Sequence, residues 1–203
     1  MELMVISSPD DVADESIIIN QLFQSGLKYL HIRKPGSNIT AVRELMNGIA
    51  PRFYNRISLH QFHEVADDYG IKRLHYTERA RIELNEQKWQ LQLDKGYILT
   101  TSIHNTALLP LLTGFEYIFY GPVFDSISKI GYRSNVPPGF KLDKDNTMGR
   151  VIALGGIEAS NLAEVRAMGF DGAAVLGTIW NEPDKAISRF NKLMENLPCL
   201  NKI

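Results

Sequence analysis

Cysteine is almost absent from this 203-residue chain, which contains only Cys199. A single cysteine excludes an internal disulfide framework and is typical of proteins in a reducing compartment. The chain also has no surplus of either charge, with 22 lysines and arginines against 23 aspartates and glutamates. The formal net charge is -1 and the pI is near 6.5, which argues against general nucleic-acid binding. No apolar run approaches the roughly 20 residues that a membrane helix needs. We therefore expect a cytoplasmic protein without a nucleic-acid or membrane partner.

What the chain does have is a regular spacing of glycines that follow helical patterns. In four segments a helix end is followed by glycine, an apolar residue, two spacers and a strand pattern; the glycines are Gly26, Gly70, Gly114 and Gly169. Glycine closes helices in the left-handed conformation, so these are helix-to-strand joints. The first three are spaced by 44 residues (26 to 70 and 70 to 114). Each of these intervals has the length of two strand–helix units. Four double units predict eight strands.

The hydrophobic pattern supports this count. Hydrophobic residues make up 44% of the chain, so we expect one domain over 1–203. Helical patterns cover 15–25, 39–49, 62–69, 157–168 and 184–196, and strand patterns cover 3–7, 29–33, 57–60, 73–76, 97–102, 117–120, 150–154 and 173–176. Alternating strands and helices predict an α/β fold with a parallel sheet. Eight strands favour a closed (β/α)8 or TIM barrel over an open doubly wound sheet.

Two segments do not fit regular barrel units. Residues 85–96 are expected to form an inserted loop or hairpin. Residues 130–149, which contain Pro137, Pro138 and Gly139, are too broken for a full sixth helix. We expect an irregular sixth βα loop there.

Two consecutive strands near the C-terminus end in glycine and lead into helical patterns, at 153–157 and 172–179. Glycine lets the backbone approach a ligand closely, and the free N–H groups at a helix start favour an anion. Barrels of this kind place a phosphate after their last two strands. The glycines of a single such loop are equally compatible with a simple chain turn, but the pair predicts a phosphate site that involves Gly156, Leu176 and Gly177.

Polar side chains collect at the expected C-terminal ends of the other strands, where such barrels have their active sites. If Leu30 and Ile32 face the helices, alternation turns His31 and Arg33 inward, and the same reasoning turns His60 inward. Any single histidine there is equally compatible with a structural, hydrogen-bonded role. The set as a whole predicts a site; its members are His31, Arg33, His60, His75, Ser102, His104 and Lys129.

A zinc site is the rival interpretation of gathered histidines. The spacing contains no paired signature such as His-Glu-x-x-His, and no inward carboxylate at a strand end completes a ligand set. We therefore assign no metal ligand. The loop with Ser126, Ser128 and Lys129 combines two hydroxyls with an ammonium group, which suits a phosphate or diphosphate, although a solvated polar loop would look the same.

These motifs together resemble the thiamine phosphate synthase and TenI superfamily of (β/α)8 barrels. The resemblance runs through His31-Ile32-Arg33, Ser102-Ile103-His104, the stretch from Tyr120 to Lys129, and the two glycine-ended strands. It implies a thiazole phosphate bound by Ser126, Ser128, Gly156, Leu176 and Gly177, with Lys129 and Arg33 facing a pyrimidine diphosphate. The implied enzyme is a transferase that joins the two substrates and expels pyrophosphate, with magnesium on the diphosphate.

At several positions this chain has other residues than the family's motifs, and these differences bear on whether the synthase reaction is retained. Gln61 and Ala80 stand where the synthase has magnesium-binding carboxylates, and the last lysine of the pattern, one position after Lys34, is missing unless Lys34 substitutes for it. Pro122 stands where TenI-type isomerases have a histidine, whose acid–base role His31, His60 or His104 could take. The candidate catalytic residues are thus Lys129, Arg33, His104 and His60, with His31 and Ser102 also binding substrate.

Three functions remain open at this point. One is a thiamine-biosynthesis enzyme, either a synthase with a rearranged metal site or a TenI-like thiazole isomerase. The second is a non-catalytic TenI-like binder or regulator, and the third is another phosphate-handling barrel isomerase. No cofactor has clear ligands, magnesium being expected only with a substrate diphosphate. The expected partners are small molecules, with a homodimer as an open alternative.

Overall fold

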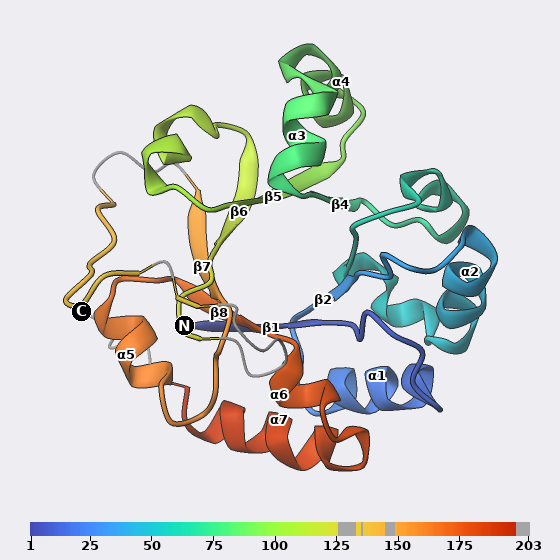
Figure 1. Ribbon diagram of the computed structural model, residues 1–203. Coiled ribbons are helices and arrows are strands. Elements are labelled where there is room, and N and C mark those ends of the chain that lie inside the picture. The colour runs from blue at the N-terminus through green and yellow to red at the C-terminus, as the bar shows by residue number, and fades with distance from the viewer. Residues whose placement is uncertain (126–132, 135, 145–148, 198–203) are drawn as a thin grey trace.

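The computed structural model describes residues 1–125, 133–134, 136–144 and 149–197. Within them eight parallel strands close into a barrel in which each strand pairs with the next and the last pairs with the first (Figure 1). This confirms the (β/α)8 class. The strands are β1 (Glu2–Ile6), β2 (Tyr29–Ile32), β3 (Ile57–Leu59), β4 (Arg73–Tyr76), β5 (Ile98–Ile103), β6 (Phe115–Tyr120), β7 (Arg150–Leu154) and β8 (Gly172–Val175).

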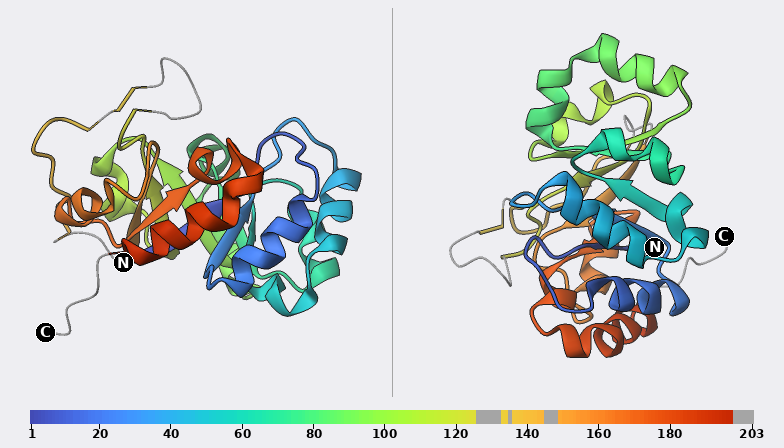
Figure 2. Two further views of the ribbon diagram at one scale, coloured as in Figure 1. Left: turned by 90° about the horizontal axis from the view of Figure 1, so that it is seen from below. Right: turned by 90° about the vertical axis from the view of Figure 1, so that its right-hand side faces the viewer.

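Helices surround the barrel on the outside, as Figure 1 shows. The four joint glycines all have positive φ, between 65° and 102°, as their role in ending helices requires. Figure 2 shows α1 against α7 on one side of the barrel, and α3 with α4 beyond β5 at another. The helices are α1 (Glu15–Gln24), α2 (Ile39–Gly48), α3 (Glu78–Leu84), α4 (Glu86–Asp94), α5 (Leu162–Ala167), α6 (Gly177–Trp180) and α7 (Ala186–Glu195).

Alternation along the strands divides the core into two layers. Leu30 and Ile32 belong to the large outer layer between strands and helices, whereas Met4, Ile6 and Phe119 belong to a smaller cluster inside the barrel. Fully buried polar side chains share this interior; they are His31, Ser58, His75 and Thr100. The predicted inward orientation of His31 is therefore confirmed. A barrel interior with so many polar groups differs from the branched apolar packing that usually fills it.

The N-terminal end of the barrel is closed by ion pairs. Arg73 binds Glu116, and Arg150 binds both Glu2 and Glu116. The pKa of Arg73 is raised: burial lowers it, but the hydrogen bond and charge of Glu116 outweigh that effect. Because this end is filled, a ligand must enter at the C-terminal ends of the strands.

Several predicted boundaries need correction. The insertion at 85–96 is helical, because α4 occupies most of it, so the expected loop or hairpin is wrong. Residues 62–69 form two short 3-10 turns, η2 (His63–Val65) and η3 (Asp67–Tyr69), and not one helix. The pattern at 157–168 gives only the six residues of α5. Within 130–149, the described residues before β7 form no helix or strand.

Further 3-10 turns are η1 (Pro51–Arg56), η4 (Thr106–Leu111) and η5 (Pro183–Lys185). Among the described residues, no helix combines the length and apolar character needed to cross a bilayer.

Candidate functional site

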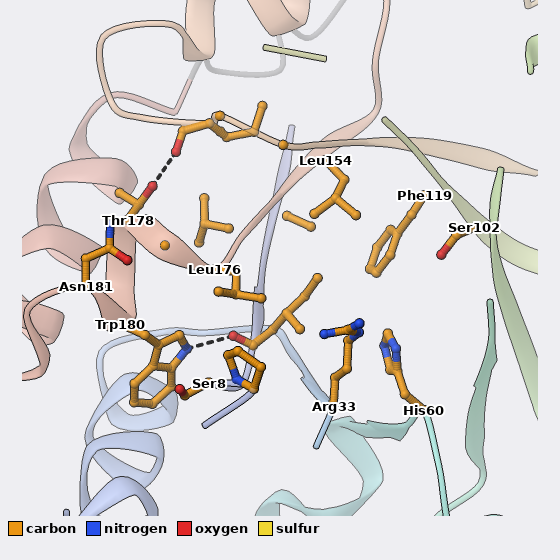
Figure 3. Close-up of a pocket in the computed structure, with 18 of the residues that line it drawn as sticks. Ser8, Arg33, His60, Ser102, Phe119, Leu154, Leu176, Thr178, Trp180 and Asn181 are labelled. Atoms are coloured by element: carbon orange, nitrogen blue, oxygen red, sulfur yellow. Dashed lines mark hydrogen bonds between the residues drawn. The ribbon is translucent and has the colours of Figure 1, made fainter. Parts of the chain in front are cut away.

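A cavity of about 500 Å³ opens at the C-terminal ends of the strands. Figure 3 shows Arg33 and His60 on one side of it, and Thr178 with Asn181 on the other. Its lining comes from loops far apart in the sequence: Ile6, Ser8, Pro9, Asp10, Arg33, His60, Thr77, Ser102, Phe119, Leu154, Gly155, Gly156, Ile157, Ala174, Val175, Leu176, Gly177, Thr178, Trp180 and Asn181. The volume is that of a small-molecule site.

One wall of the cavity consists of the two glycine-containing loops after β7 and β8. Gly155 and Gly156 have φ values of 98° and 63°, and a side chain at Gly156 would overlap the backbone of Asp125. Among the described residues, the backbone N–H groups of Gly156, Gly177 and Thr178 have no hydrogen-bond acceptor. Free N–H groups on neighbouring loops can bind the oxygens of an anion.

The wall is held in place by side chains that hydrogen-bond to backbone groups. The Thr178 hydroxyl donates to the Ile157 carbonyl, which ties the two loops together. The Trp180 indole N–H donates to the Ile6 carbonyl at 2.7 Å and fixes α6 against β1. Both bonds are drawn in Figure 3. The loops are thus pre-organised, which lowers the entropic cost of binding a ligand.

On the opposite wall, Arg33 faces the cavity, whereas the side chain of its neighbour Lys34 points away from it. Arg33 lines the cavity, and its backbone N–H donates to the Ser7 hydroxyl at 2.9 Å. Lys34 is buried, and its Nζ donates to Glu15 Oε2 at 2.5 Å and to the Asp10 carbonyl at 2.9 Å. Lys34 is therefore committed to an internal ion pair and does not replace the lysine that the family pattern has nearby.

Three histidines meet at the floor of the cavity. His31 Nδ1 lies 2.9 Å from His60 Nε2, and His31 Nε2 lies 2.7 Å from the Tyr117 hydroxyl. His75 stacks on His60 with ring centroids 3.9 Å apart. His75 Nε2 is also 2.8 Å from the hydroxyl of Ser102, which lines the cavity. His31, His60 and His75 are called the histidine cluster below.

Burial keeps the histidine cluster neutral. It lowers the pKa of His31 to about 3, and the charge of Arg73 adds to the shift. The pKa values of His60 and His75 are also well below the ordinary value, mainly because of burial and then because of neighbouring rings. Burial disfavours the charged form of an imidazole. These side chains can offer lone pairs or neutral N–H groups to a ligand, but no positive charge.

Comparison with known proteins shows the family to which this chain belongs. A family model described as thiamine monophosphate synthase matches residues 3–179. The chain belongs to this family. A putative thiamine-phosphate synthase of Geobacter sulfurreducens is 24% identical over 189 residues, 89% of this chain and 86% of the relative. A thiamine-phosphate synthase of Methanocella arvoryzae is 35% identical over 97 residues, 44% of each chain.

Solved structures resemble the chain in fold. The crystal structure of thiamine phosphate pyrophosphorylase from Bacteroides thetaiotaomicron superposes with a TM-score of 0.73 at 24% identity and covers 97% of both chains. The thiamine phosphate pyrophosphorylase from Pyrococcus furiosus gives 0.76 at 19% identity, over 96% of this chain and 94% of that one. At these identities the likeness shows the barrel fold alone.

The residues predicted from the family pattern fall into three groups. Arg33, His60, Ser102, Gly156, Leu176 and Gly177 line the cavity. His31 lies behind His60, and His104 is a half-exposed side chain paired with Glu78, at 2.7 Å between Nδ1 and Oε2, outside the cavity lining. Ser126, Ser128 and Lys129 lie outside the described residues. We therefore do not retain His104 as a catalytic candidate.

The magnesium that the family implies does not fit the residues present. Gln61 is uncharged and its Oε1 accepts the Lys34 N–H at 3.0 Å. Ala80, on α3, has no ligand atom. Among the described cavity-lining residues, Asp10 is the one carboxylate. A hard cation such as magnesium needs several oxygen ligands, so the described lining of the cavity does not hold it by itself.

Sequence reasoning missed the contribution of the loop after β1. Ser8 and Asp10 line the cavity, and the Asp10 carbonyl binds Lys34. The signal was available, since both residues follow a predicted strand at its C-terminal end. Thr178 and Asn181, which follow Gly177, were also overlooked because only the glycine loop itself was considered.

Proposed function

We propose that this member of the thiamine monophosphate synthase family binds a thiazole phosphate in the cavity, with its phosphate at Gly156, Leu176 and Gly177. One observation carries the proposal: two pre-organised loops present free N–H groups side by side on one wall of a cavity of ligand size. Each charge-assisted hydrogen bond to a phosphate contributes about 1.5–3 kcal/mol.

The opposite wall suits a second anionic substrate. Arg33, directly after β2, faces the same cavity, and a guanidinium recognises phosphate oxygens by paired N–H groups. We assign it to a pyrimidine diphosphate, together with Lys129, which follows β6 in sequence and lies outside the described residues. Magnesium would have to arrive with that diphosphate. The synthase reaction is then very slow or absent, because Gln61 and Ala80 supply no carboxylate.

Calorimetric titration with the thiazole phosphate tests the binding step. The Gly177→Val variant places a branched side chain against the proposed phosphate position. It should weaken binding by about 10–150-fold or more, the equivalent of one lost charge-assisted hydrogen bond. Gly36→Val is the matched control, because a side chain there meets nothing within 4 Å. Equal affinity in the two variants would contradict the assignment.

A further inference from the structure

The histidine cluster has a geometry that the sequence spacing did not suggest. His31, His60 and His75 come from the ends of three neighbouring strands, β2, β3 and β4, which places them 29 and 15 residues apart in sequence (31 to 60 and 60 to 75). All three are buried, and one ring nitrogen of each lies within 4.8 Å of the others. Adjacent parallel strands bring together residues that no local motif connects.

The surrounding hydrogen bonds orient two of the three rings. The Thr100 hydroxyl donates to the Leu74 carbonyl at 3.4 Å, so it accepts from His75 Nδ1 at 2.9 Å and leaves the lone pair of His75 on Nε2, which now accepts from the Ser102 hydroxyl at 2.8 Å. The Tyr117 hydroxyl holds His31 at Nε2, so Nδ1 is the nitrogen that faces His60. Histidines that bind metals are typically held in this way, by a partner on the other ring nitrogen.

The cluster also contains polar atoms whose hydrogen-bonding capacity is unused. Among the described residues, His60 Nδ1 and the neighbouring Ser58 hydroxyl are buried without a partner. Buried polar atoms are nearly always paired, so such exceptions require an explanation such as a bound ion or water. His60 also lines the cavity, so a ligand held by the cluster would be accessible to a small molecule there.

We propose that His31, His60 and His75 bind a divalent transition metal, zinc being the best match, with one coordination position open to the cavity. Three neutral imidazoles form a ligand set that suits zinc and not magnesium. Three protein ligands and an open position are the usual arrangement of catalytic zinc sites. The site is independent of the thiazole proposal, since it uses none of the glycine loops.

Binding requires a local rearrangement of the rings. Tetrahedral zinc holds its nitrogens about 3.3 Å apart, as follows from bonds of about 2.0–2.1 Å. The present 2.9 Å contact between His31 Nδ1 and His60 Nε2 must therefore give way to the metal, and His60 must tilt out of its stack on His75. The Ser102 hydroxyl must also release His75 Nε2. His31 would then ligate through Nδ1 and His75 through Nε2.

The test is a titration of the chelator-treated full chain with zinc, and separately with cobalt(II). We expect one metal per chain, a raised melting temperature, and the intense visible bands of four- or five-coordinate cobalt. Variants His31→Gln, His60→Gln and His75→Gln should each lose more than about 100-fold in zinc affinity, since loss of a supporting hydrogen bond alone costs about 10–100-fold. His104→Gln, an exposed histidine, is the matched control.

Tyr117→Phe keeps the ring and removes only the hydroxyl on His31, so it remains informative if a glutamine variant fails to fold. We expect it to lose about 10–100-fold in zinc affinity. Three results would overturn the proposal: no zinc bound by the unmodified chain, the weak spectrum of six-coordinate cobalt, or equal affinities in His75→Gln, Tyr117→Phe and His104→Gln. The cluster would then be a hydrogen-bonded neutral network.

Discussion

At the scale of single residues, the pair formed by Lys34 and Glu15 shows how neighbouring positions can have different roles. Arg33 faces the cavity, whereas the side chain of Lys34 is buried and its ammonium group pairs with the Glu15 carboxylate. The Lys34 and Glu15 side chains are each only 6% exposed. Burial raises the pKa of Glu15, and the hydrogen bond and charge of Lys34 oppose that rise. Lys34 therefore stabilises the loop after β1 and does not bind substrate.

Removing one partner of this pair should destabilise the fold. Lys34→Met leaves the Glu15 carboxylate buried without compensation, and we expect the free energy of unfolding to fall by about 3–5 kcal/mol in urea denaturation. The double variant Glu15→Gln/Lys34→Met removes both charges and should recover most of that loss. A change below about 1 kcal/mol in the single variant would show that the pair is solvated and not buried.

Arg33 should act on the second substrate and not on the thiazole phosphate. Arg33→Ala is expected to weaken pyrophosphate binding by about 1.5–3 kcal/mol, because a charge-assisted hydrogen bond is lost. Its effect on the thiazole phosphate should be much smaller. Calorimetry with both ligands measures this, and Arg79→Ala, a fully exposed arginine on α3, serves as the control. Equal losses for both ligands would mean that Arg33 is assigned to the wrong substrate.

At the scale of elements, a strand or helix could be predicted from the sequence where its hydrophobic residues follow a clear periodic pattern. The strands were predictable because alternation places Leu30 and Ile32 outside and His31 inside. Helix α4 was not, because its apolar face is short: Trp89 and Leu93 pack on the core, and neither is fully buried. Its signal is local: the Asn85 side chain accepts the Lys88 N–H at 3.2 Å and caps the helix start.

Asn85 offers a paired test of that helix start. It has φ 61° and ψ 167°, a conformation that is strained for any residue except glycine, by about 1–3 kcal/mol. Asn85→Ala loses the cap and keeps the strain, so the chain should lose about 0.5–2 kcal/mol of stability. Asn85→Gly relieves the strain, and the loss of the cap costs only a few tenths of a kcal/mol. This variant should therefore stabilise the protein. Equal denaturation midpoints for both variants would contradict this.

At the scale of the whole molecule, the spacing of the joint glycines was enough to predict eight strands, and barrel architecture then placed the site at the strand ends. What the sequence could not supply were contacts between side chains on different strands. The stack of His75 on His60 and the commitment of Lys34 to Glu15 depend on distances across the barrel. His104 was assigned to the site because it follows β5, but it pairs with Glu78 outside the cavity.

We propose that this chain retains the phosphate-binding wall of its family and has lost the magnesium anchor. The most direct test is a synthase assay with a thiazole phosphate and a pyrimidine diphosphate over a range of magnesium concentrations. Purified protein should form thiamine phosphate very slowly or not at all, with little response to magnesium, since Gln61 and Ala80 offer no carboxylate.

The triple variant His60→Asn, Gln61→Asp and Ala80→Asp should raise both the rate and its magnesium dependence in the same assay. Robust magnesium-dependent turnover by the unmodified protein would contradict the account. It would mean that Glu78 or another carboxylate near the rim holds the metal, and that the chain is a synthase with a rearranged site.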